Sequence, residues 1–357
     1  MVRLLIQSNQ ELIGKVHPMR DLPVPAPSPQ FDMFAKFYGN PKKLSNTIDL
    51  WDAIPKYSCS ARKQAALRDH AGYLPVWTCS FVYKRPETSD KISAEMEIKP
   101  ARLKTKGVEK DFLPSANEEL VEEVLRKIFA DQKYGSHYTA EEESYVDFSL
   151  AMIAKELRDR GHSRSLEQIK HSLLVMNECR LALFFQGNSK KAAYRGAIIP
   201  ETLEVNRADY LSDPTSKWRV RLPFVYSQAV NSLEFRQFNY EVLMSMSSQL
   251  ARWLHKLLSR RYTNASITQP YQTRYSTIKR DSGLLVHSRE DRNRETVRDA
   301  IEELKSQDVV LYYKIAKSVN NSRDPLYQLT PTGTFVSEMK AANKRQTANK
   351  HRLSVGE

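Results

Sequence analysis

The spacing of apolar residues predicts strands and helices that alternate from about residue 63 onward. Residues 72–84 are rich in aromatic and β-branched side chains, and residues 92–98 alternate apolar with polar side chains. Both features are typical of strands. Apolar residues at helical spacing follow over 115–131, 148–161 and 165–178.

Two of these helices carry start signals. Ser115 precedes Glu118 and Ser165 precedes Gln168 by three positions, which is the pattern of a capping box. Strand composition over 179–186, turn residues at 187–191 and a further strand around 198–199 come next. Helix, turn, helix and hairpin in this order predict a winged helix.

The same order recurs later in the chain. A helix over 248–260 precedes a short helix over 275–282, which ends at Gly283, a residue suited to a left-handed cap. Ser288 is expected to start the next helix, and strands over 309–316 and 326–330 flank a turn. A last helix is expected from Pro331 to about residue 343. Ser165 and Ser288 would then mark equivalent places in a duplicated architecture.

The predicted fold class is therefore α+β, with two tandem winged-helix domains and a flexible Pro-rich N-terminal arm. Four prolines within residues 21–29 favour an extended segment without a core of its own. The expected organisation is an arm over 1–60, winged helices over 61–225 and 226–343, and a basic tail over 344–357.

The positive charge is concentrated. The 357 residues carry a net charge of +13, of which residues 252–298 supply +7 and residues 155–195 supply +5. Two basic islands predict two contacts with one polyanion, most simply DNA. The alternative is that they are solvated helix faces. The stretch 340–352 holds only positive charges and is expected to add nonspecific electrostatic contacts.

Several function classes lack their usual residues. The three cysteines form no C-x-x-C pair, which argues against a disulfide framework and a zinc site. No phosphate-binding loop, no His-x-His pair and no acidic pair placed at a strand end is present. We therefore expect no enzyme, no metal and no cofactor. With no signal peptide and no membrane-length apolar run, a cytoplasmic location is expected.

The strongest DNA-binding candidate is the helix after Gly283. With Val297, Ile301 and Leu304 facing inward, its outer side carries cations and an amide that suit base edges and phosphates. We expect base contacts from Arg294 and Arg298, a further contact from Asn293, and phosphate contacts from Arg289 and Arg292. The alternative is a salt-bridged surface helix, because Glu295 and Glu302 are within reach of these arginines.

Further cations are expected to position the phosphate backbone. In the second unit these are Lys279, Arg280, Arg274 and Arg260, with Lys317 and Arg323 on the wing. In the first unit the helix that begins after Ser165 is expected to face DNA in the same way as the helix after Gly283, with Arg164, Gln168 and Lys170 as candidates and with Lys190 and Lys191 on or beside its hairpin. The first unit is also a candidate dimerisation surface.

The run Leu-Ala-Arg-Trp-Leu at 250–254, Pro270-Tyr271 and residues 289–304 resemble the C-terminal winged helix of iteron-binding plasmid replication initiators of the TrfA and RepA type. Residues 99–102 and 112–126 resemble the entry to the N-terminal unit of that family. The resemblance implies binding to direct repeats in double-stranded origin DNA, melting of adjacent A·T-rich DNA, recruitment of the host helicase and host initiator, and a monomer–homodimer equilibrium.

One short segment resembles a peptide that docks on the bacterial sliding clamp. It runs from Gln30 to Phe34, where Gln30 would anchor and Met33 and Phe34 would fill an apolar pocket. The alternative is a local hydrophobic cluster with Phe37 and Tyr38.

Two further function classes remain besides a replication initiator. A transcriptional repressor with tandem winged helices would bind an operator without melting DNA. A relaxase-type nicking enzyme would cleave a strand in the presence of metal.

Overall fold

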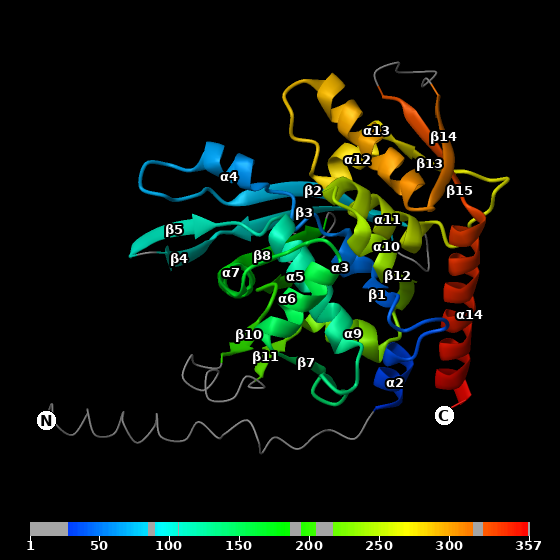
Figure 1. The fold of residues 1–357 in the computed structure, drawn as a ribbon, viewed down its shortest axis with the longest axis horizontal. Coiled ribbons are helices and arrows are strands. Elements are labelled where there is room, and N and C mark those ends of the chain that lie inside the picture. Colours follow the sequence, from blue (N-terminus) through cyan, green and yellow to red (C-terminus); the bar gives the residue numbers. More distant parts are fainter. Residues whose placement is uncertain are drawn as a thin grey trace, which may run out of the picture.

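The computed structural model describes residues 28–84, 90–105, 107–185, 194–204, 217–316 and 324–355, with the element labels of Figure 1. The chain folds as an α+β protein, as predicted. The part up to Ser245 contains most of the described strands, and the part after it forms a smaller group of helices beside a three-stranded sheet (Figure 1).

The first part of the chain builds a helical core between antiparallel sheets. One sheet has the order β2-β3-β8-β9 and another has the order β10-β11-β7-β6. The strands are β2 (Trp77–Lys84), β3 (Lys91–Lys99), β6 (Gly135–Tyr138), β7 (Glu143–Phe148), β8 (Arg180–Phe185), β9 (Tyr194–Gly196), β10 (Glu201–Leu203) and β11 (Trp218–Arg221). The helices are α5 (Ala116–Phe129), α6 (Leu150–Asp159), α7 (Leu166–Glu178) and α9 (Phe224–Asn231). The predicted strand over 92–98 is confirmed, with Ala94, Met96 and Ile98 buried.

Two projections leave this part of the molecule on one side (Figure 1). They are α4 (Ala61–Leu67) and a two-stranded ribbon of β4 (Ala101–Thr105) and β5 (Val108–Phe112). The sequence pattern did not indicate this ribbon.

The second part has the element order of a winged helix. It consists of α11 (Gln249–Arg261), β13 (Tyr271–Arg274), α12 (Tyr275–Ser282), α13 (Glu290–Ser306), β14 (Val310–Ala316) and β15 (Leu326–Pro331). The three strands form one antiparallel sheet in the order β13-β15-β14. Gly283 ends α12 with a φ of 63°, which confirms the predicted left-handed cap.

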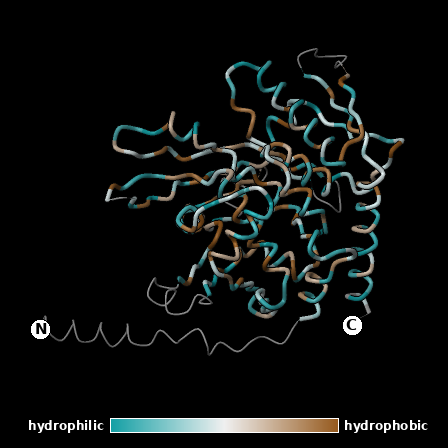
Figure 2. The backbone as a smooth tube through the Cα atoms, in the orientation of Figure 1, coloured by the Kyte–Doolittle hydropathy of each residue, from teal (hydrophilic) through white to brown (hydrophobic). Residues whose placement is uncertain are grey.

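Two hydrophobic cores correspond to the two parts. The first extends from Phe31 to Met244 and the second from Met246 to Met339. Figure 2 shows the apolar segments gathered toward the middle of the molecule, with hydrophilic segments mostly at its edges. The predicted boundary at residue 226 is therefore wrong, because α9, β12 (Phe235–Asn239) and α10 (Tyr240–Ser245) pack into the first core.

The prediction of a flexible arm over residues 1–60 is wrong for the described residues from 28 onward. These form α2 (Pro29–Ala35), β1 (Leu44–Ile48) and α3 (Asp49–Ala53). β1 pairs antiparallel with β12, from Leu44 opposite Asn239 to Ile48 opposite Phe235. Phe31, Phe34 and Trp51 are buried in the first core. The segment therefore contributes apolar side chains to that core, and their burial favours the folded state. Residues 1–27 lie outside the described residues.

The basic tail also differs from the prediction. The last helix, α14 (Gly333–Val355), continues past residue 343 and runs beside α2 (Figure 1). Arg345 is buried and donates hydrogen bonds to the carbonyl oxygens of Met33 (2.8 Å) and Phe34 (2.7 Å) and to Asn46 Oδ1 (2.6 Å). Arg345, which was expected to make nonspecific electrostatic contacts, thus links α14 to α2.

The helix starts agree with the prediction in two cases of three. The Ser165 N–H donates to Gln168 Oε1 (2.9 Å) and the Gln168 N–H donates to Ser165 Oγ (3.2 Å). The Ser115 N–H likewise donates to Glu118 Oε2 (2.8 Å). Ser288 is not a cap, because α13 begins at Glu290 after Arg289. The equivalence of Ser165 and Ser288 is lost with it.

Candidate nucleic-acid interface

The inner face of α13 is the predicted one. Val297, Ala300, Ile301 and Leu304 are buried against the second core, and this fixes which side chains face outward. In a winged helix the corresponding helix enters the major groove of DNA.

Three arginines lie on the outward face of α13 and at its start. The side chains of Arg289 and Arg292 are 71% and 59% exposed, and they pair with Asp291 (2.5 Å) and Glu295 (2.8 Å). Arg298 is exposed and forms no hydrogen bond or ion pair with a described residue. Exposed ion pairs contribute about 0–1 kcal/mol, so phosphate can replace the carboxylates at little cost.

Asn293 does not face outward, so its assignment to DNA is wrong. Its side chain is 0% exposed, accepts from the His287 N–H (3.0 Å) and donates to the His287 carbonyl oxygen (2.9 Å). The amide therefore fixes the loop between α12 and α13, because it satisfies two backbone groups there.

Arg294 occupies an intermediate position. It is half-buried, with its guanidinium carbon 5.4 Å from the centre of the Tyr275 ring. Of the two arginines expected to contact bases, Arg298 is therefore the more accessible.

The flanking cations of α12 lie at the surface. Lys279 pairs with Glu290, and Arg280 contacts Asp281 through two bonds of 2.7 and 2.9 Å. Arg274 is exposed and lies 4.0 Å from Asp324. All three side chains are accessible to solvent, whereas Lys317 and Arg323 of the wing lie outside the described residues.

Arg260 is not a phosphate ligand, which corrects another prediction. It is buried and donates to the carbonyl oxygen (3.0 Å) and to Oδ1 (3.1 Å) of Asp49. Its partner belongs to α3, so Arg260 joins the two parts of the chain.

The first unit offers a weaker interface. Arg164 Nε donates to Asn117 Oδ1 (2.8 Å), Gln168 is used in its own capping box, and Lys170 pairs with Glu204 (2.7 Å). Lys190 and Lys191 lie outside the described residues. The three described candidates thus already have partners within the chain.

The segment expected to bind a sliding clamp is packed into the protein. Phe34 is 0% exposed and meets the rings of Phe129 (5.2 Å between centroids) and Phe235 (4.9 Å). Met33 is buried as well, and Gln30 is half-buried at the start of α2. The alternative of a hydrophobic cluster is therefore the correct one in this structure, and the cluster is a core rather than a local contact.

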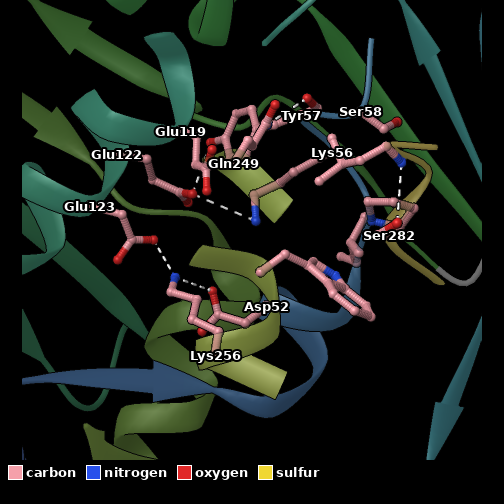
Figure 3. A pocket seen from close by; sticks show the side chains of 14 residues that line it. Asp52, Lys56, Tyr57, Ser58, Glu119, Glu122, Glu123, Gln249, Lys256 and Ser282 are labelled. Atoms are coloured by element: carbon pink, nitrogen blue, oxygen red, sulfur yellow. Dashed lines mark hydrogen bonds and ion pairs between the residues drawn. The ribbon is translucent and has the colours of Figure 1, made fainter. Parts of the chain in front are cut away.

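A network of buried charged side chains between the two parts of the chain was not predicted from the sequence. Figure 3 shows it around a cavity of about 50 Å³ lined by α3, α5 and α11. Asp52 accepts from Arg126 (2.6 and 2.8 Å) and from Lys256 (2.9 Å), and Lys256 also pairs with Glu123. Lys56 lies 3.6 Å from Glu122.

This network shifts the pKa values of its members. Burial opposes ionisation of Asp52, but the charges of Arg126 and Lys256 outweigh it and hold the pKa well below its usual range. Burial raises the pKa of Glu123 and lowers that of Lys56. Asp52 is therefore negatively charged in the folded protein, and the positive charges of Arg126 and Lys256 keep it in that state.

The sequence contained a signal for this junction. Arg252, Lys256 and Arg260 recur every four residues and so share one face of α11. Arg252 pairs with Glu119 of α5 (2.9 Å) and Lys256 with Glu123, again four residues apart. Part of the basic island over 252–298 therefore faces the first unit instead of a polyanion.

The described part of the chain contains neither a candidate metal site nor a candidate membrane-spanning helix. Within those ranges no group of three or more His, Cys, Asp or Glu side chains is arranged to hold a metal ion. Among the described helices, none has the length and apolar character that crossing a membrane requires.

Comparison with known proteins gives remote structural matches. No protein-family model matches the chain, and no curated protein matches its sequence. The chain is similar in structure to the Pi initiator protein crystallised with iteron DNA, at a TM-score of 0.42 and 11% identity over 61% of this chain and 91% of that one. It is also similar to domains 2 and 3 of RctB, at a TM-score of 0.43 and 11% identity over 75% of this chain and 95% of that one. The first of these proteins is an initiator, which is the class that the sequence resemblance indicated.

Proposed function

We propose that this chain is a non-enzymatic plasmid replication initiator of the bacterial cytoplasm, which binds direct repeats in double-stranded origin DNA. The observation that carries the proposal is the exposed arginine face of α13. Arg298 has no ion-pair partner among the described residues, and Arg289 and Arg292 are exposed at the start of the same helix with weakly held carboxylates.

The surrounding cations support the same assignment. Lys279, Arg280 and Arg274 lie on α12 and at its start, where the helix before the recognition helix crosses the phosphate backbone in winged-helix proteins. Base contacts from α13 and phosphate contacts from α12 would fix both register and orientation on a duplex.

After binding, the proposed initiator melts adjacent A·T-rich DNA and recruits the host helicase and host initiator. A monomer–homodimer equilibrium belongs to the same proposal. The buried state of Phe34 removes the sliding clamp from the expected partners of this conformation.

The test is a footprint of the purified protein on the origin region of its own replicon at physiological salt, beside random duplex. Regularly spaced protection over direct repeats is expected, with permanganate-reactive thymines in the neighbouring A·T-rich segment. Protection of a single promoter site without melting would make the protein a repressor, and metal-dependent strand cleavage would make it a nicking enzyme.

Variants make the test residue-specific. Arg298→Ala should cost roughly 1–3 kcal/mol of specific affinity and relax one base position. Arg62→Ala is the matched control, because Arg62 is also an exposed arginine and lies on another helix, α4. Equal losses in the two variants would show that the contact is general electrostatics and not recognition by α13.

A further inference from the structure

A large cavity lies between α2, the loop that follows it, the end of α5, α6 and the end of α14. Its volume is about 910 Å³, which falls in the range of about 300–1,000 Å³ that small-molecule sites occupy. Figure 1 shows α2 and the end of α14 together at one edge of the molecule. The cavity shares no lining residue with the cavity of the buried charge network.

Five cations line this cavity without a carboxylate partner. None of them forms an ion pair with an Asp or Glu side chain among the residues that the structure describes. All are exposed except Lys127, which is half-buried. The five are Lys36, Lys42, Lys127, Lys133 and Arg352.

The three carboxylates of the lining already have partners within the chain. Glu156 pairs with Arg160 (3.2 Å), and Asp131 Oδ1 accepts a backbone N–H (3.1 Å). Asp32 accepts from the side chain of Gln132. The cavity therefore keeps an excess of positive charge, and a cleft lined by one sign of charge attracts ions of the opposite sign.

Helix ends account for only part of this arrangement. Lys36 follows α2, and Lys127 and Arg352 lie in the last turns of α5 and α14, where a positive charge is favourable. Lys42 and Lys133 lie in turns outside these helices. Helix dipoles therefore do not explain why all five cations meet at one cavity.

Lys127 holds its charge at the wall of the cavity. Its ammonium group donates to the carbonyl oxygens of Pro41 and Leu44, which are neutral acceptors. Burial lowers the pKa of Lys127 to about 8, because desolvation disfavours the charged form. A bound anion would offset this cost, since a nearby negative charge favours the protonated amine.

The lining also indicates which anion fits. Five cations around a cavity of this size match a ligand with several negative charges, and lysine is a common ligand of phosphate. Phe37, Ile128 and Met152 give the same cavity an apolar portion, which suits a ring system. A nucleotide combines several charges with an aromatic base.

We propose that this cavity binds a nucleoside triphosphate, with the phosphates at the five cations and the base against the apolar portion. Binding alone is proposed, without a reaction of the nucleotide. The cavity shares no residue with α12 or α13, so the proposal stands apart from the proposed DNA contacts.

Equilibrium dialysis of the full chain without DNA, at physiological salt, measures the binding of ATP, GTP, CTP and UTP in separate titrations. At least one of them should bind at one site per chain. The K36Q/K133Q double variant should weaken this binding about ten-fold or more, because two charge-assisted contacts are lost. Both lysines are exposed and have no ion-pair partner among the described residues, so the substitutions should leave the fold intact.

The K340Q/K344Q double variant is the matched control. It removes the same charge from two exposed lysines of α14 that do not line the cavity, and it should bind as the wild type does. If none of the four nucleotides binds, or if both double variants lose affinity equally, the proposal is overturned. Because the titration contains no DNA, its outcome does not depend on whether α13 binds repeats.

Two competitors separate the sources from which such phosphates could come. Inorganic triphosphate should bind more weakly than the nucleotide, because it leaves the apolar portion of the cavity uncovered. Equal affinity for triphosphate would contradict the base contact and with it the nucleotide. A single-stranded oligonucleotide at equal phosphate concentration should not displace the nucleotide, and displacement would assign the cavity to a nucleic-acid strand instead.

Discussion

Replacing Asp52 by Asn tests whether the buried network joins the two parts of the chain. The carboxylate receives five hydrogen bonds: two from Arg126, and one each from Lys256, the Thr47 hydroxyl (2.6 Å) and the Ile48 N–H (2.8 Å). Its side chain is only 2% exposed. An asparagine amide keeps the shape of the side chain but removes its negative charge. Its N–H groups also point at donors whose hydrogen bonds the carboxylate oxygen accepted.

The magnitude follows from the charges that remain. Asp52, Glu122 and Glu123 face three cations, so the substitution leaves one uncompensated positive charge in the interior. Removing one partner of a buried ion pair costs about 3–5 kcal/mol. We expect a loss of this size in the free energy of unfolding.

Urea denaturation at pH 7 measures the loss. Trp51 fluorescence is a suitable local probe, because the Trp51 indole N–H donates to Glu122 Oε1 (2.5 Å) beside the network. Asp159→Asn is the control, because Asp159 forms an exposed pair with Lys155 and its loss should leave stability nearly unchanged. A loss at Asp52 no larger than that of the control would refute the buried network as a stabilising junction.

The pH dependence provides a second check on Asp52. Its pKa is lowered in the folded state, so its stabilisation is present above its unfolded value of about 3.9. This stabilisation is lost as the pH falls through the folded pKa. The wild type should therefore lose more stability on acidification below about pH 4 than Asp52→Asn does.

Three other substitutions have defined expectations. Burial lowers the pKa of His255 to about 3, so His255→Leu should flatten the fall in stability between about pH 6 and pH 4 by roughly 1.4 kcal/mol per pH unit, measured by urea titration. Phe34→Ala should cost about 3–5 kcal/mol by the same assay, and an unchanged stability would show that α2 is not part of the core. Arg345→Ala should lower the melting temperature because three buried hydrogen bonds from its guanidinium are lost, whereas the exposed Lys344→Ala should leave it unchanged.

Much of the local structure follows from periodicity. The strand over 92–98 and the inner face of α13 were predicted correctly. Apolar residues at every second position lie on one side of a strand, and apolar residues three or four positions apart lie on one side of a helix. The cap at Gly283 was predicted for a similar reason, since a positive φ favours glycine. The start of α13 was not, because Asn293 holds the preceding loop and no local pattern shows that contact.

The candidate interface was predicted in outline only. Arg289, Arg292 and Arg298 are at the surface as expected, since a residue opposite an apolar stripe must face outward. Arg260 and Asn293 are buried instead, each held by groups that the helix pattern does not reveal.

The sequence by itself determined the α+β class, the positions of elements with clear periodicity such as β3, α5 and α13, and the outward side of α13, because these depend on neighbours within about one or two helical turns. Only the tertiary structure decided which charged side chains are buried and where the segment from α2 to α3 packs. Asp52 meets Lys256 across 204 positions, and Arg345 meets Phe34 across 311. A lysine that is exposed to solvent and a lysine that pairs with a buried carboxylate cannot be told apart in the sequence. They differ in the desolvation of the ammonium group, which occurs only when distant segments pack together.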